Sequence, residues 1–196
     1  MTRIKHPSKV SSHLSLWLGL VAAVAVGAAV FYALQVHARK RMSGQISYAK
    51  AMPSESTLRA QLNKEQYNVM REGGTEPPFH NQYYDNQKPG IYVDPITGEP
   101  LFSSTDKFDA GLGLPSFTKP IGKDHVVLKK DSSHGLERVE VRSAKSNSHL
   151  GHLFNDGPPP ANQRYTVNSA ALHFVPLEKM REEGYGEFLP LFDEKK

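Results

Sequence analysis

The stretch Arg-Tyr-Thr-Val-Asn-Ser, residues 164–169, has the residue types of an active-site floor: a guanidinium, a hydroxyl and an amide side by side. Its centre is Thr166, and the chain contains no cysteine. Thr166 is therefore a catalytic residue, a replacement for one, or an ordinary strand residue. We favour the last interpretation, because threonine is β-branched and suits a strand. The lack of cysteine also excludes disulfides, thiolate metal sites and catalysis by a thiol of this chain.

Two histidines, His149 and His152, stand close together in the stretch Ser-His-Leu-Gly-His-Leu-Phe. Imidazoles move protons or bind metal ions near neutral pH. Side chains at positions i and i+3 of a β-strand point to opposite faces. We therefore expect no metal site shared by this pair, and no cofactor.

Length and charge limit the possible function classes. The 196 residues allow one domain of usual size and an appendage, and 14 prolines with 15 glycines indicate a loop-rich fold. The net charge of +4 comes partly from Arg3, Lys5, Lys9 and the cluster at 39–41. These charges flank an apolar segment, which favours phosphate headgroups over nucleic acid as partners.

Residues 14–34 contain no charged side chain and are long enough to cross a hydrocarbon core of ~30 Å. A cleaved signal peptide is the alternative, but its apolar region would be shorter. We predict a basic tail at 1–13, a single-pass transmembrane helix at 14–34, a linker at 35–57 and a domain at 58–196. The N-terminus is expected inside, with the domain on the outer face, periplasmic or facing an intermembrane space. Gly19, Ala23 and Gly27 form a small-residue face on which another helix can pack.

Short apolar runs separated by turn residues predict a mainly β domain with antiparallel pairing. One helix is expected from Ser56 or Thr57 to Gly73, and a second short helix from Pro176 to Gly184. In Glu-Arg-Val-Glu-Val-Arg-Ser, valines and charged residues alternate. The predicted strands are 90–93, 126–130, 137–142, 149–154, 164–168 and 171–175.

Several motifs then resemble the type B methionine-R-sulfoxide reductases, over about residues 58–190. They include GTEPPF, PGIYVDPITGEPLFSS, SHGLERVEVRS, SHLGHLFNDGPP and RYTVNS, in the family's order. The resemblance implies two antiparallel sheets in a distorted barrel-like sandwich with peripheral short helices. It also implies reduction of methionine-R-sulfoxide in proteins by a thiolate that attacks the sulfoxide sulfur.

In the resemblance, the family's nucleophilic cysteine aligns with Thr166, its resolving cysteine with Leu112, and its substrate-contacting tryptophan with Leu114. The implied substrate pocket consists of His149, His152, Phe154, Asp156, Arg164 and Asn168. Some members bind zinc through two Cys-x-x-Cys pairs. Those positions hold Asp94, Thr97, Ser143 and Ser146 here, so we expect no zinc.

Because a threonine hydroxyl cannot replace a thiolate, we expect the chain not to be an enzyme. The first hypothesis is a membrane-anchored accessory subunit of a membrane protein complex, with the bilayer and integral membrane subunits as partners and no nucleic acid. A binding module for oxidised methionine is the second hypothesis. Residual reductase activity with an external thiol is the third.

Overall fold

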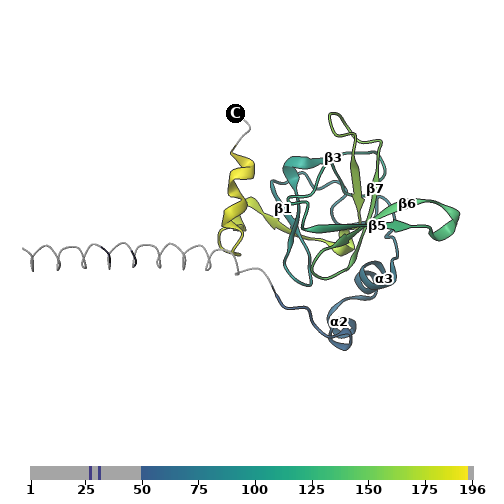
Figure 1. The fold of residues 1–196 in the computed structure, drawn as a ribbon, viewed down its shortest axis with the longest axis horizontal. Helices are drawn as coiled ribbons and strands as arrows, with labels where there is room; N and C mark the ends of the chain where they lie inside the picture. Colours follow the sequence, from purple (N-terminus) through teal and green to yellow (C-terminus); the bar gives the residue numbers. More distant parts are fainter. Residues whose placement is uncertain (1–26, 28–30, 32–49, 194–196) are drawn as a thin grey trace, which may run out of the picture. The chain divides into compact units, whose positions relative to one another are not determined.

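The computed structural model describes residues 27, 31 and 50–193 (Figure 1). The chain divides into two units, Met1–Gln45 and Ile46–Lys196, and the elements below belong to the second. Within the described residues, no helix has the length and apolar character to cross a membrane. The predicted span 14–34 and its small-residue face at Gly19, Ala23 and Gly27 lie outside the described part, apart from Gly27 and Phe31, which are helical.

Two short helices open the domain where the sequence predicted one. Helix α2 spans Glu55–Gln61 and is capped by the hydroxyl of Ser54. Helix α3 spans Lys64–Glu72. Asn63 accepts a hydrogen bond from the N–H of Gln66, and the Gln66 side chain accepts one from the Asn63 N–H. This capping box starts a new helix, and so the expectation of one continuous helix is wrong.

A six-stranded antiparallel sheet carries most of the domain, and its β5–β6 hairpin projects from the body (Figure 1). The strand order is β3 (Lys107–Phe108), β4 (Ser116–Phe117), β8 (Arg164–Val167), β7 (His149–Phe154), β6 (Arg138–Ser143) and β5 (Val126–Asp131). Strands β3 and β4 were not predicted from the sequence, because two-residue strands are too short to show alternation of apolar and polar side chains.

A three-stranded sheet has the order β2 (Pro100–Ser103), β1 (Gly90–Val93) and β9 (His173–Pro176), again with antiparallel pairs. The prediction of a mainly β fold with two antiparallel sheets and short helices is therefore confirmed. Their closure into a barrel-like sandwich stays a prediction. Strand β2 was not predicted, because it begins at Pro100. A proline in a short apolar run counts against a strand there.

The main core is aromatic and joins elements distant in sequence. Phe102 of β2 stacks on Phe117 of β4 with ring centroids 4.6 Å apart, and Tyr92 of β1 contacts Phe117 edge-on at 5.2 Å. All three side chains are fully buried. Such pairs add about 0.5–1.5 kcal/mol each to the gain from burial, so this core holds the edge of the six-stranded sheet near Thr166 in place.

The predicted C-terminal helix is wrong. Residues Leu177–Lys179 form a 3₁₀ turn, and a second 3₁₀ segment spans Gly186–Phe192. The N–H of Leu177 donates to the carbonyl of Pro89, and Met180 and Tyr185 are buried in a second core cluster. These tertiary contacts hold the segment in tight turns, which an isolated sequence pattern does not reveal.

Candidate active site

One row of polar side chains crosses a face of the six-stranded sheet. Ser116 of β4 lies directly opposite Thr166 of β8, which lies opposite His152 of β7, which lies opposite Glu140 of β6. Directly opposite residues of an antiparallel pair share a face. The sheet therefore brings Thr166 and His152 together from strands that are separate in sequence.

A β-bulge adds His149 to this row. The register shifts between Val141 and Arg142, so that Gly151 pairs with Val141 whereas His149 pairs with Arg142. The extra residue, Leu150, reverses the alternation of side chains along β7. The rings of His149 and His152 then meet edge-on, with centroids 5.4 Å apart. The expectation that these rings point to opposite faces is therefore wrong.

Each histidine is held by a carboxylate that the sequence pattern did not predict as part of the site. Nδ1 of His149 lies 2.7 Å from Oε1 of Glu140, and Nε2 of His152 lies 2.8 Å from Oδ2 of Asp131. Hydrogen bonds from the hydroxyl and N–H of Ser133, and then from His152, hold the pKa of Asp131 below 3.8. Burial disfavours ionisation of Glu140, but its bonds to His149 and Arg142 outweigh burial and lower its pKa. Both carboxylates are therefore ionised acceptors at neutral pH.

The second nitrogen of His149, Nε2, is buried without a hydrogen-bond partner among the residues that the structure describes. Burial lowers the pKa of His149 below 6.5, against the opposing effect of Glu140. The ring is therefore neutral at pH 7. Because Glu140 accepts from Nδ1–H, Nε2 carries the lone pair. A buried polar atom without a partner costs free energy, so this nitrogen is a ready acceptor for a proton of a bound molecule.

Arg164 organises the surroundings of Thr166. Its Nη1 donates to the Thr166 hydroxyl at 2.6 Å, while Nε and Nη2 donate to the two carboxylate oxygens of Asp156, both at 2.9 Å. The guanidinium carbon lies 4.2 Å from the ring centroid of Phe154. The hydroxyl of Ser116 lies 3.1 Å from that of Thr166. A group at position 166 is therefore fixed beside a permanent positive charge.

Asn168 is buried and binds the backbone of β7 and of the segment before β1. Its Nδ2 donates to the carbonyl of Leu150 at 2.9 Å, and its Oδ1 accepts from the N–H of Glu76 at 3.0 Å. The Asn168 N–H also donates to the Leu150 carbonyl. Since Leu150 is the bulge residue, Asn168 supports the backbone that orients His149.

Leu112 and Leu114 belong to the loop between β3 and β4. Leu112 is 45% exposed, whereas Leu114 is half-buried. The loop reaches the row at Pro115, whose carbonyl accepts from the N–H of Val167 at 3.0 Å. Ser116, the next residue of the chain, then lies opposite Thr166.

The four positions that resemble zinc-binding cysteines form a buried hydrogen-bonded cluster instead. Asp94 accepts from the N–H of Ile96 at 2.8 Å and from the Ser146 hydroxyl at 2.5 Å. The N–H of Thr97 donates to Asp94, and that of Ser146 donates to the hydroxyl of Ser143. In residues 50–193, no three histidine or acidic side chains are placed to share a metal ion. The cluster joins the β1–β2 turn to the β6–β7 turn.

Comparison with known proteins identifies the family. Residues 62–176 match the SelR domain. The chain belongs to the SelR family. A relative from Vibrio cholerae serotype O1, named peptide methionine sulfoxide reductase MsrA/MsrB, is 53% identical over 144 residues. This region is 74% of the chain and 38% of the relative. The resemblance to type B methionine-R-sulfoxide reductases is thereby confirmed at the level of the family.

This relative also corrects one expectation. From the absence of cysteine we expected that the chain is not an enzyme, but a relative at 53% identity carries the name of a reductase. The expectation is therefore contradicted. The sequence pattern did not predict Glu140 and Asp131 as the hydrogen-bond partners of His149 and His152. The alternation in Glu-Arg-Val-Glu-Val-Arg-Ser could have indicated Glu140, since it puts this carboxylate on the polar face of its strand.

Proposed function

We propose that the SelR domain binds methionine-R-sulfoxide in proteins and supports its reduction by a thiol from outside the chain. The observation that carries this proposal is the pair His149–His152: among residues 50–193, Nε2 of His149 has no hydrogen-bond partner, and His152 lies opposite Thr166. The family membership and the reductase name of the Vibrio cholerae relative also support it. The chain itself contains no cysteine, so the thiol has another source.

The proposed chemistry starts with the neutral His149 ring as a base. An incoming thiol gives its proton to Nε2, and the thiol sulfur attacks the sulfoxide sulfur. Glu140 stabilises the imidazolium, which returns the proton to the sulfoxide oxygen. A second thiol attacks the bound thiol sulfur and forms a disulfide, and the bond between that sulfur and the methionine sulfur breaks. The sulfur–oxygen bond breaks, the oxygen leaves as water with one proton from each thiol, and the two electrons reduce the sulfoxide to the thioether.

The test is a titration of histidine-labelled protein with N-acetyl-methionine-R-sulfoxide, followed by NMR. We expect saturable shifts of the His149 and His152 signals and slow turnover with dithiothreitol. The double variant His149→Ala, His152→Ala should lower turnover to the rate in buffer, because it removes the base and its neighbour. The matched control is His173→Ala, since His173 is exposed on β9. Equal rates for the wild type and the double variant would contradict the proposal.

We further propose that residues 14–34 anchor this domain to a membrane, with the domain on the outer face, as an accessory subunit of a membrane protein complex. The apolar run of the sequence supports the anchor. One structural observation supports a protein partner: β5 is an edge strand, and its Val127 and Leu128 are 46% and 48% exposed. Exposed apolar edge strands pair readily with another chain.

Extraction of the full chain in mild detergent tests this second proposal. We expect the chain to migrate in a particle larger than itself, with crosslinks to a partner from Gly19, Ala23 or Gly27 replaced by a photoreactive residue. A photoreactive residue at Thr2, in the predicted basic tail, is the matched control. A chain that migrates alone and crosslinks to no protein would overturn the proposal.

A further inference from the structure

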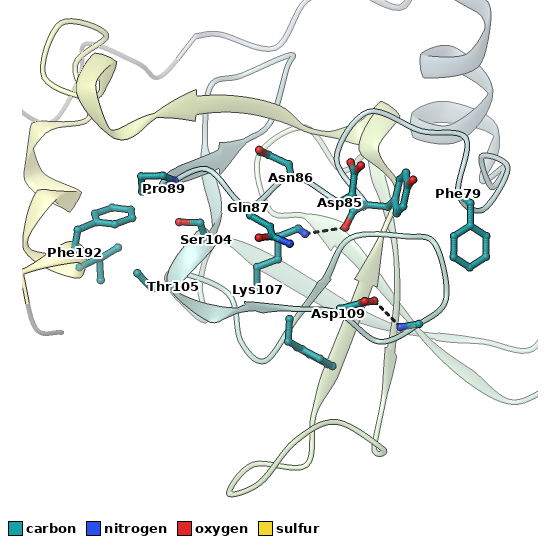
Figure 2. Close-up of a pocket in the computed structure, with 14 residues that line it drawn as sticks. Phe79, Asp85, Asn86, Gln87, Pro89, Ser104, Thr105, Lys107, Asp109 and Phe192 are labelled. Carbon is teal, nitrogen blue, oxygen red and sulfur yellow. Dashed lines mark hydrogen bonds between the residues drawn. The ribbon is translucent and has the colours of Figure 1, made fainter.

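The domain contains a pocket of about 610 Å³ whose described lining includes neither Thr166 nor His149 nor His152. Its walls come from the segment before β1, from β3 with the loop after it, and from the 3₁₀ segment Gly186–Phe192 (Figure 2). Sites for small molecules commonly enclose about 300–1,000 Å³. The function proposed above gives this space no role, so the chemistry of its walls decides what it can bind.

Lys107 of β3 supplies the positive charge of this pocket. Its Nζ donates to the carbonyl of Tyr84 at 2.9 Å, and within residues 50–193 it forms no ion pair. An ammonium group has three N–H donors, so two remain for another acceptor. The side chain is half-buried, and burial lowers the pKa of Lys107 below 10.5. A half-buried cation without a counter-ion is poorly compensated, so an anionic group bound beside Nζ would be favourable.

Two carboxylates on the pocket wall argue against a simple anion as the ligand. Asp109 and Asp85 are exposed there, and their charges partly offset the effect of burial on the pKa of Lys107. The N–H of Gly111 donates to Oδ1 of Asp109 at 2.8 Å, which fixes this carboxylate. One ammonium and two carboxylates leave the lining net negative, so a dianion would be repelled. A ligand with one anionic and one cationic group matches both signs.

Aromatic rings close the two ends of the pocket. Figure 2 shows Phe192 at one end and Phe79 at the other. Phe192 packs against the second core cluster. The N–H of Phe79 donates to the carbonyl of Gly113 at 2.9 Å, and a Cβ on Gly113 would be 2.6 Å from Cγ of Phe79. Both rings are therefore held in place before a ligand binds, and each offers apolar surface to a side chain of the ligand.

We propose that this pocket binds a dipeptide with two apolar side chains, its carboxylate on Lys107 and its ammonium on Asp85 and Asp109. A dipeptide carries one charge of each sign at its ends and one side chain for each aromatic ring. A free amino acid has a single side chain, and a longer extended peptide carries its two charges too far apart for one wall. Binding involves no oxidised methionine, so this inference does not rest on the function proposed above.

The experiment is calorimetric titration of the full chain in mild detergent with leucyl-phenylalanine and three capped forms of it. The amide lacks the carboxylate, the N-acetyl form lacks the ammonium, and the doubly capped form lacks both. We expect saturable binding of the free dipeptide. The dissociation constant should rise about tenfold for the amide, because a hydrogen bond between charged groups is lost. It should rise about threefold for the N-acetyl form, because the carboxylates are exposed.

Variants assign each charge to its partner. In Lys107→Met, which keeps the length of the side chain without its charge, the free dipeptide and its amide should bind equally. In the double variant Asp85→Asn, Asp109→Asn, the free dipeptide and its N-acetyl form should bind equally, and the new amide at 109 can still accept from Gly111. Lys129→Met is the matched control, since Lys129 is exposed on β5, outside the pocket lining. It should reproduce all the wild-type values.

The capped forms test the wild type without any variant having to fold. Absence of saturable binding of the free dipeptide would overturn the proposal, and so would equal binding of the free and doubly capped forms. A tenfold difference between dipeptide and amide that persists in Lys107→Met would overturn the placement of the carboxylate. No reduction is measured, so none of these results depends on the function proposed above.

Discussion

Replacing Thr166 by cysteine is expected to raise the rate of methionine-R-sulfoxide reduction about 10³-fold over the wild type. The reason is proximity: a thiolate on β8 attacks within the bound complex, whereas an external thiol must arrive from solution. The charge of Arg164, which now donates to the Thr166 hydroxyl at 2.6 Å, would stabilise the thiolate and lower the pKa of the thiol. The measurement is single-turnover reduction of N-acetyl-methionine-R-sulfoxide at equal protein concentrations.

Thr166→Ser is the matched control, because it keeps a hydroxyl at the same position and should leave the rate at the wild-type value. The double variant Thr166→Cys, Arg164→Leu should lose part of the gain, since the thiol loses its neighbouring cation. Because the chain has no other cysteine, thiol titration reports on position 166 alone. Equal rates for Thr166→Cys and Thr166→Ser would contradict the prediction and show that the surface around Leu114 no longer accepts the substrate.

Asp94→Ala is expected to lower the free energy of unfolding by about 3 kcal/mol. Asp94 is fully buried and accepts hydrogen bonds from the N–H groups of Ile96 and Thr97 and from the Ser146 hydroxyl. Its truncation would leave these donors buried without an acceptor, and each such donor costs about 1–3 kcal/mol in isolation. Urea denaturation followed by circular dichroism measures the change.

The control for this prediction is Asp124→Ala, which makes the same deletion at a side chain that is 90% exposed. We expect a change of less than about 0.5 kcal/mol there. If the free energy of unfolding falls equally little in both variants, the buried N–H and hydroxyl groups donate to other acceptors when Asp94 is removed. The cluster then does not hold the β1–β2 and β6–β7 turns together.

Much of the sheet was predictable because its signal is local. The alternation of Val139 and Val141 with charged residues marks β6, although only Val141 is fully buried and Val139 is 37% exposed. Turn residues bounded the runs that became β1, β5, β7 and β8. The two-residue strands β3 and β4 were not predicted, because two residues are too few to show the alternation of apolar and polar side chains that marks a strand. The two helices at 55–72 were taken as one, because both share an apolar spacing and only the capping box at Asn63 separates them.

The sequence by itself determined the family and the chemical character of position 166. Those depend on residue types in order along the chain, and the lack of cysteine removes a thiolate whatever the fold. Only the tertiary structure decided that His149 and His152 face each other, because the bulge at Leu150 depends on how β6 and β7 pair. Only it decided that Glu140 and Asp131 hold these histidines, and that Phe79 lies against Gly113. Contacts between strands depend on register and packing, and one bulge changes which side chains meet.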